Sequence, residues 1–178
     1  MSTRGAIVRF KNGEGTMFEG RYHHWDSYPR GLGKTLWHLY HGHFEENLQR
    51  MLEVLIDEHP AGWSTINGKN FKLEPGFAAE GMHPLCFCHG ERSEKGCLIT
   101  QYDASRFGCE YVYGFDEGRV LVILSSYHAN GKKMIGFAGA GDPWARWREI
   151  GRAPLVGPEP DWDRIQCGDN LEQCGHYK

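Results

Sequence analysis

The segment from residue 23 to residue 35 concentrates side chains that bind small molecules. Trp25 and Tyr28 offer ring faces on which a planar group can stack, and His24 and Asp26 offer directional hydrogen bonds. The glycine-rich stretch that follows begins a predicted helix, whose free N–H groups and dipole favour an anion. The segment therefore predicts a site for a small anionic or nucleotide-like ligand. The residues of this predicted site are His24, Trp25, Asp26, Tyr28, Arg30, Gly31, Gly33, Lys34 and Thr35.

The glycines of this segment are not a Walker phosphate-binding motif. The run Gly31-Leu32-Gly33-Lys34-Thr35 resembles the end of such a motif, but Tyr28 stands where its first glycine is needed. We therefore expect one phosphate or carboxylate at the helix start rather than a bound triphosphate. The competing interpretation is a packed corner of Trp25, Tyr28 and Pro29, in which the glycines only turn the chain.

The cysteines and two late histidines form a second set of chemically useful side chains. The first thirty residues contain no export signal, so we expect a cytoplasmic protein with reduced thiols rather than disulfides. Thiolates and imidazoles are the ligands that zinc prefers, and a structural zinc would restrain the glycine-rich middle of the chain. The competing interpretation is a set of buried free cysteines. The predicted ligands, of which a subset would be used, are Cys86, Cys88, His89, Cys97, Cys167, Cys174 and His176.

A further cluster of polar side chains runs from residue 23 to residue 43. It contains histidines at positions 23, 24, 38, 41 and 43 beside Asp26. Such groups can hold a divalent metal or act as a general acid and base, so a metal-dependent hydrolase is an alternative function. The competing interpretations are a ligand-facing polar pocket without metal and a polar layer that is hydrogen-bonded to the backbone between a sheet and its helices. No H-E-x-x-H spacing occurs, and no catalytic residue is assigned.

The N-terminus offers a second route to a hydrolase. Removal of Met1 would leave Ser2 with a free α-amine that can serve as its own base. The opening Ser2-Thr3-Arg4, followed by Gly20-Arg21 and by Asp26, is similar to the choloylglycine-hydrolase and penicillin-acylase group of N-terminal-nucleophile enzymes. Those chains begin Cys-Thr-Arg and carry a Gly-Arg-x-x-Asp stretch. The resemblance implies that Ser2 is a nucleophile, although the chain has Ser for Cys and is short for that group's four-layer fold.

A longer stretch resembles another family. Residues 3–7, Thr-Arg-Gly-Ala-Ile, and residues 24–33, with the pattern His-x-Asp-x-Tyr-Pro-x-Gly-x-Gly, resemble small, mostly uncharacterised proteins of bacteria and their phages. The resemblance covers about the first forty residues and implies a phage or prophage context. Proteins of that kind often sequester a nucleotide signal or block a host enzyme. A host protein is therefore an alternative partner, and a protein-protein interaction module is an alternative function.

These side chains must be positioned by a small number of strands and helices. Residues 4–10 form a short apolar run and residues 16–22 alternate, on either side of Asn12-Gly13, a turn dipeptide typical of a hairpin. Apolar residues at helical spacing predict helices over 32–41 and 44–58. Strand-like runs over 109–116, 119–127 and 132–138 predict a meander, and residues 144–150 predict a short helix. The expectation is an α+β fold with an antiparallel sheet of about five strands and a helix pair on one face.

Length and charge limit the remaining classes. The chain of 178 residues predicts a single domain over 1–178, with a long irregular excursion over 60–108 and an irregular tail over 153–178. The net charge of −3 disfavours general binding to nucleic acid. No apolar run approaches the length of a membrane helix, so no membrane partner is expected. The first expectation is a ligand-binding protein.

Overall fold

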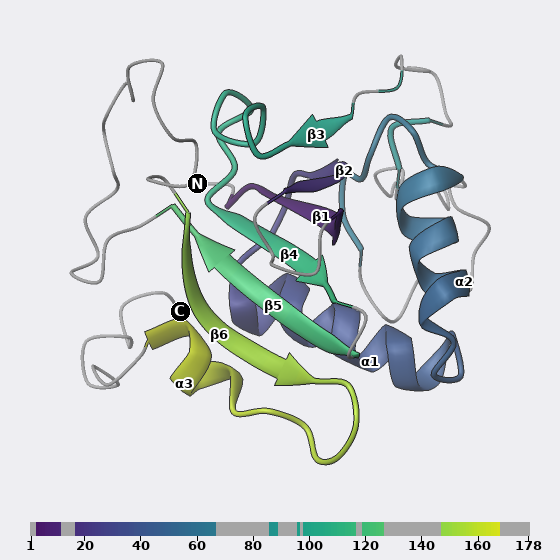
Figure 1. Ribbon diagram of the computed structural model, residues 1–178, viewed down its shortest axis with the longest axis vertical. Coiled ribbons are helices and arrows are strands. Elements are labelled where there is room, and N and C mark those ends of the chain that lie inside the picture. Colours follow the sequence, from purple (N-terminus) through teal and green to yellow (C-terminus); the bar gives the residue numbers. More distant parts are fainter. Residues whose placement is uncertain are drawn as a thin grey trace, which may run out of the picture.

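A computed structural model of the chain describes residues 3–11, 17–66, 86–88, 96, 98–116, 119–126 and 147–167. Its centre is a six-stranded mixed sheet with the order β3-β2-β1-β4-β5-β6 (Figure 1). The strands are β1 (Gly5–Phe10), β2 (Phe18–His23), β3 (Ile99–Thr100), β4 (Tyr111–Phe115), β5 (Val120–Ser125) and β6 (Arg148–Pro154). The helical elements are the π-helical turn η1 (Pro29–Gly33), α1 (Lys34–Gly42), α2 (Leu48–Leu52), the π-helical turn η2 (Glu53–Asp57) and α3 (Trp162–Cys167).

The first strand lies in the middle of the sheet and pairs on both sides. It is antiparallel to β2, with Gly5 opposite His23, and parallel to β4, with Gly5 opposite Tyr111. The α+β class is confirmed, but the wholly antiparallel sheet of about five strands is wrong. The parallel pair arises because β3 returns antiparallel to β2, and residues 101–110 then cross to the far side of β1 before β4 begins.

The sheet is buried on both faces. Successive strand residues point to opposite faces, so Ile7 and Ile123 belong to one apolar cluster while Val8 and Leu124 belong to the other. The first cluster lies under the helices, and the second is covered in part by residues between β3 and β4. The helical side chains in the first cluster are Leu32, Leu36, Leu39, Tyr40, Met51, Val54, Leu55, Ile56 and Trp162. The covering side chains in the second are Ala104, Cys109 and Trp147.

The two predicted helices exist, with a later start for the second. Residues 29–42 form a continuous helical segment from η1 into α1, behind β4 and β5 in Figure 1. The second begins at Leu48 rather than at residue 44, because Glu45 and Glu46 adopt positive φ angles of 47° and 63°. The side chain of Asn47 then caps it by accepting the N–H of Arg50 at 3.0 Å.

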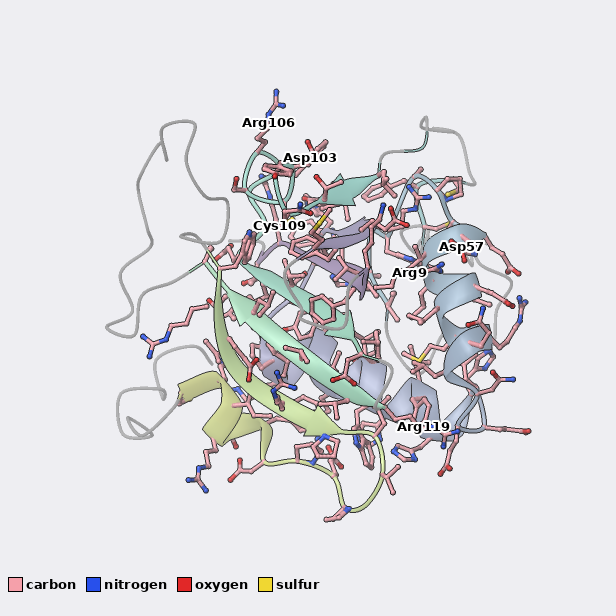
Figure 2. The ribbon with its side chains drawn as sticks, in the orientation of Figure 1. Arg9, Asp57, Asp103, Arg106, Cys109 and Arg119 are labelled. Carbon is pink, nitrogen blue, oxygen red and sulfur yellow. The ribbon has the colours of Figure 1, made fainter. Side chains whose placement is uncertain are left out.

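The second helical segment is fastened to the sheet by two arginines. Arg9 on β1 forms an ion pair with Asp57 at 2.6 Å, and Figure 2 shows the two side chains side by side. Arg21 on β2 donates from Nε to the carbonyl oxygen of Ile56 at 2.7 Å. Both contacts hold the end of η2, and with it the chain that leads on to His59, against β1 and β2.

The C-terminal region differs from its prediction. The helix predicted over 144–150 is wrong where it is described, because residues 148–154 form β6 beside β5. The tail predicted to be irregular contains α3, which packs on η1 and β6. The Asn12-Gly13 turn and the strand predicted over 132–138 lie outside the described residues. Within the described part of the chain, no helix has the length and apolar character needed to span a membrane.

Candidate functional site

The predicted site begins where β2 ends, and its backbone is tied down on both sides. His24 and Trp25 donate their N–H groups to the carbonyl oxygens of Trp63 and Ser64, at 3.0 and 3.1 Å. Asp26 then adopts a left-handed φ of 56°, and its carbonyl oxygen accepts the N–H of Leu32 at 3.0 Å. The loop is therefore a rigid corner that holds Trp25 and Asp26 at the surface.

The first amides of the predicted anion site bind other groups of the chain. The N–H of Gly31 donates to the carbonyl oxygen of Tyr28 at 2.9 Å, and that of Arg30 donates to Oε1 of Gln166 at 3.2 Å. A Cβ added to Gly31 would lie 2.3 Å from the carbonyl oxygen of Asp26. This glycine is therefore required by a close backbone approach, and these two amides are not directed at a ligand.

Arg30 and Lys34 line a hollow of about 450 Å³ between the start of the first helical segment and α3. Arg30 pairs with Asp163 at 3.0 Å, and Lys34 lies 3.7 Å from Glu159. Three acids and two bases line the hollow, so its charge does not favour an anion. The lining residues are Arg30, Lys34, Glu159, Pro160, Asp161, Trp162 and Asp163.

A different surface gathers the ring faces. Tyr22, His24, Trp25, Phe87 and Phe107, here called the aromatic patch, come from three separate parts of the chain. The ring centroids of His24 and Trp25 are 4.7 Å apart. The ring of Tyr22 lies 6.4 Å from that of Phe87, with which it is stacked, and 6.2 Å from that of Phe107. Trp25 is 44% exposed and Phe107 is 41% exposed, so the patch faces solvent.

The polar groups of the aromatic patch are neutral, and a cation lies beside them. Burial raises the pKa of Tyr22 and lowers that of His24, and the Arg4 guanidinium further lowers the pKa of His24. The Tyr22 hydroxyl and Nδ1 of His24 share a hydrogen bond of 2.8 Å, which fixes the imidazole ring against the phenol. The exposed Arg4 also reaches the chain beside Phe107, since a Cβ added to Gly108 would lie 3.2 Å from its Nη1.

The structure thus divides the predicted site between two surfaces. His24 and Trp25 join the aromatic patch, whereas Arg30 and Lys34 line the hollow beside α3. Gly33 is buried, and a Cβ there would meet the rings of Trp162 and Tyr113 at 3.0 and 3.1 Å. Thr35 is half-buried at the start of α1, and the ring of Tyr28 lies close to Gly31.

The sequence prediction missed part of the aromatic patch. Tyr22 and His24 have the two-residue spacing that places strand side chains on one face, and this signal was available. Phe87 and Phe107 approach only through tertiary contacts. Phe107 belongs to the turn whose Asp103 and Arg106 are labelled in Figure 2. Arg4 is distant in sequence from Phe87 and Phe107, so no local pattern indicates that it lies beside the aromatic patch.

One serine and one histidine lie in contact but do not form a nucleophile and its base. His23 and Ser27 are both buried, with Nδ1 2.7 Å from Oγ. Nε2 of His23 accepts the N–H of Ile66 at 3.1 Å, so the proton of the neutral ring is on Nδ1 and is donated to Ser27. Because the imidazole donates to the hydroxyl, it cannot act as its base in this arrangement.

The predicted histidine cluster is spread over separate contacts. His38 contacts Glu159 at 3.2 Å, His41 contacts Glu46 at 3.2 Å, and His23 is buried beneath the loop. Within the residues that the structure describes, only one group of three metal-binding side chains gathers its ligand atoms. That group is a different one, formed by His59, Cys86 and Cys88, whose ligand atoms all lie within 4.8 Å of one another.

The predicted cysteine set is divided in a similar way. Cys86 and Cys88 are free thiols and lie together, while Cys109 is a free thiol in the second apolar cluster. Cys167 at the end of α3 is disulfide-bonded, so the expectation of a reduced thiol is wrong at this position and Cys167 is not available as a zinc ligand. His89, Cys97, Cys174 and His176, like Ser2, lie outside the described residues. His59 was missed because it is twenty-seven residues before Cys86.

Comparison of the chain with protein-family models, with curated proteins and with solved structures finds no significant match. Neither resemblance noted in the sequence is therefore supported by these comparisons.

Proposed function

We propose that this protein binds a small ligand that carries a planar ring and an anionic group, as a nucleotide does. The supporting observation is the aromatic patch beside Arg4. Two of its rings, Trp25 and Phe107, are more than two-fifths exposed, and their neighbours hold them at the surface. Exposed apolar side chains that gather in one place are typical of an interaction site.

The chemistry of the aromatic patch suits each part of such a ligand. Neutral rings at the surface offer faces for stacking, and an aromatic side chain contributes about 1–3 kcal/mol for each stacked base. Arg4 supplies a planar cation that can form two parallel hydrogen bonds with a phosphate. No ion pair to Arg4 occurs within the described residues, so an anionic group would meet a cation without displacing a carboxylate.

The proposal also changes the place of the site expected from the sequence. The ring faces of His24 and Trp25 are retained. The anion is assigned to Arg4 rather than to the helix start, because the amides of Arg30 and Gly31 already have partners. The hollow beside α3 serves instead as the comparison site, since Lys34 lies there and is half exposed.

The test is a calorimetric titration of the protein with adenosine monophosphate (AMP) and with adenosine. Trp25→Ala is expected to weaken AMP binding by about tenfold, since the loss of one stacked ring costs about 1–3 kcal/mol. Arg4→Ala is expected to remove the preference for AMP over adenosine, because only AMP carries the phosphate. Lys34→Ala and Tyr102→Ala are matched controls, a cation in the hollow and an exposed aromatic outside the aromatic patch, and both should bind as the wild type does.

Two results would contradict the proposal. The first is the absence of measurable AMP binding at millimolar concentration by wild-type protein that is folded by circular dichroism. The second is a larger effect of Lys34→Ala than of Trp25→Ala, which would return the ligand to the hollow. Melting temperatures of the variants separate lost binding from lost folding, and the exposed positions of Arg4 and Trp25 predict little change in them.

A further inference from the structure

Three soft ligand atoms meet beside the edge of the sheet. His59 lies two residues after the end of η2, while Cys86 and Cys88 come from a segment twenty-seven and twenty-nine residues further along the chain. Their ring nitrogen and two sulfur atoms all lie within 4.8 Å of one another. We propose that His59, Cys86 and Cys88 bind one zinc ion.

The distances suit zinc. Zinc–sulfur bonds of about 2.3 Å and zinc–nitrogen bonds of about 2.0–2.1 Å place neighbouring ligand atoms of a tetrahedral site about 3.5–3.8 Å apart. The ligand atoms therefore need to approach by about 1 Å at most to surround an ion. One imidazole and two thiols are also a donor set that selects zinc over magnesium or calcium, which prefer oxygen.

The backbone around the three side chains supports such a site. The N–H of Ala61 donates to Sγ of Cys88 at 3.2 Å, and hydrogen bonds of this kind orient a metal-binding sulfur and stabilise its charge. The N–H of Phe87 donates to the carbonyl oxygen of Gly62 at 3.0 Å, and Trp63 forms an isolated bridge to Cys86. The turn after His59 and the two cysteines are therefore held together by contacts independent of the metal.

Neighbouring ligand atoms, rather than burial, distinguish these thiols from an ordinary apolar cysteine. Cys86 is fully buried and His59 is 4% exposed, while Cys88 is partly open to solvent and gives an ion a route of entry. Cys109 is also a buried free thiol, in the second apolar cluster as Cys86 is in the first, but among the described residues it belongs to no group of three metal-binding side chains. Cys109 therefore provides an internal comparison, a buried cysteine without the predicted metal.

The site would join two distant segments of the chain. Burial of polar ligands is stabilised by the metal that they share, and the binding energy adds to the folding energy. Phe87 lies between the two cysteines, so the metal would also fix the position of one ring of the aromatic patch. The metal proposal does not depend on ligand binding at that patch, because its evidence is the three ligand atoms.

The test is metal analysis of the full chain, purified under reducing conditions in the presence of zinc and then passed through a desalting column. We expect about one zinc per chain for the wild type. Cys88→Ser and His59→Gln should each reduce the zinc content at least several-fold, whereas Cys109→Ser should retain it. Cys88 is the preferred variant, because it is only partly buried and its loss should disturb folding least.

Cobalt substitution of the wild type keeps the proposal testable if the variants fail to fold. Co²⁺ bound to two thiolates gives an intense near-ultraviolet charge-transfer band together with visible bands typical of a tetrahedral ion. Appearance of both, and their loss on addition of zinc, is the expected result. Zinc near zero in the folded wild type, equal loss of zinc in Cys109→Ser and Cys88→Ser, or a cobalt spectrum without thiolate bands would each overturn the proposal.

Discussion

His23 and His24 are adjacent in the chain, but their imidazoles meet different surroundings. His23 is 1% exposed, lies between Ser27 and the N–H of Ile66, and has a pKa that burial lowers to about 3. His24 lies at the surface between Tyr22 and Trp25. Successive side chains of a strand point in opposite directions, which separates the two imidazoles. His23 therefore stabilises the loop from the interior, and His24 presents its ring at the surface.

The buried His23 predicts how stability depends on pH. Its unfolded pKa is near 6.5 and its folded pKa is about 3, so between these values the unfolded chain binds a proton that the folded chain does not. The free energy of unfolding should therefore fall with falling pH, by up to about 1.4 kcal/mol for each unit below 6.5. Urea denaturation from pH 7 to pH 4.5 measures this slope.

A comparison of variants isolates the contribution of His23 from that of the carboxylates. His23→Asn should be less stable at pH 7 and should show a flatter decline on acidification than the wild type. His43→Asn removes an exposed histidine and should keep the wild-type slope. Equal slopes in His23→Asn and the wild type would show that His23 is not held neutral by the fold.

At the scale of elements, the second helical segment presents its apolar side chains unequally to the sheet. Met51 and Leu55 are fully buried, whereas Leu52 is only partly buried at the end of α2. Leu55→Ala should therefore cost about 2–5 kcal/mol, and Leu52→Ala should cost clearly less. Chemical denaturation of the two variants compares them, and a larger loss for Leu52→Ala would contradict the packing described here.

The elements were predictable where their pattern was local. Nearly continuous apolar runs in β1, β4 and β5 identify strands, because a sheet buried on both faces needs apolar side chains at successive positions. Residues 144–150 misled the prediction, since Trp144, Trp147 and Ile150 have the spacing of a helix face. Trp147 instead packs in the second apolar cluster. The residues that follow it form β6, an edge strand that pairs with β5.

The helix α3 was missed because three prolines precede it. Pro154, Pro158 and Pro160 are incompatible with the interior of a helix, but α3 begins at Trp162, beyond the last of them. It packs where two glycines leave room. A Cβ on Gly33 or Gly151 would lie 3.0 Å from Trp162 or 2.9 Å from Ile165, so the position of α3 depends on contacts that no local pattern encodes.

At the scale of the whole molecule, the parallel pair of β1 and β4 decides which surface residues meet. The crossing from β3 to β4 carries Phe107 to the aromatic patch and Cys109 to the second apolar cluster. A sheet formed only from hairpins would not make that crossing. The aromatic patch could therefore be predicted only in part, as Tyr22, His24 and Trp25, whose neighbourhood in sequence keeps them together.

The same topology places on two surfaces the residues that the sequence predicted to form one site. Trp25 lies before the first helical segment, and Lys34 lies after its first turn, 3.7 Å from Glu159 in the segment that leads into α3. A ligand bound at one surface is therefore sensed by a different tryptophan from a ligand bound at the other. Trp25 belongs to the aromatic patch, and Trp162 lines the hollow.

The most direct measurement is a nuclear magnetic resonance titration of the tryptophan indole N–H groups with AMP. The chain has six tryptophans, and Trp25→Phe and Trp162→Phe assign the two that matter. Binding at the aromatic patch predicts a progressive, saturable shift of the Trp25 signal while that of Trp162 stays in place. A Trp25 signal that does not move while that of Trp162 shifts, or no shift in either, would contradict the account.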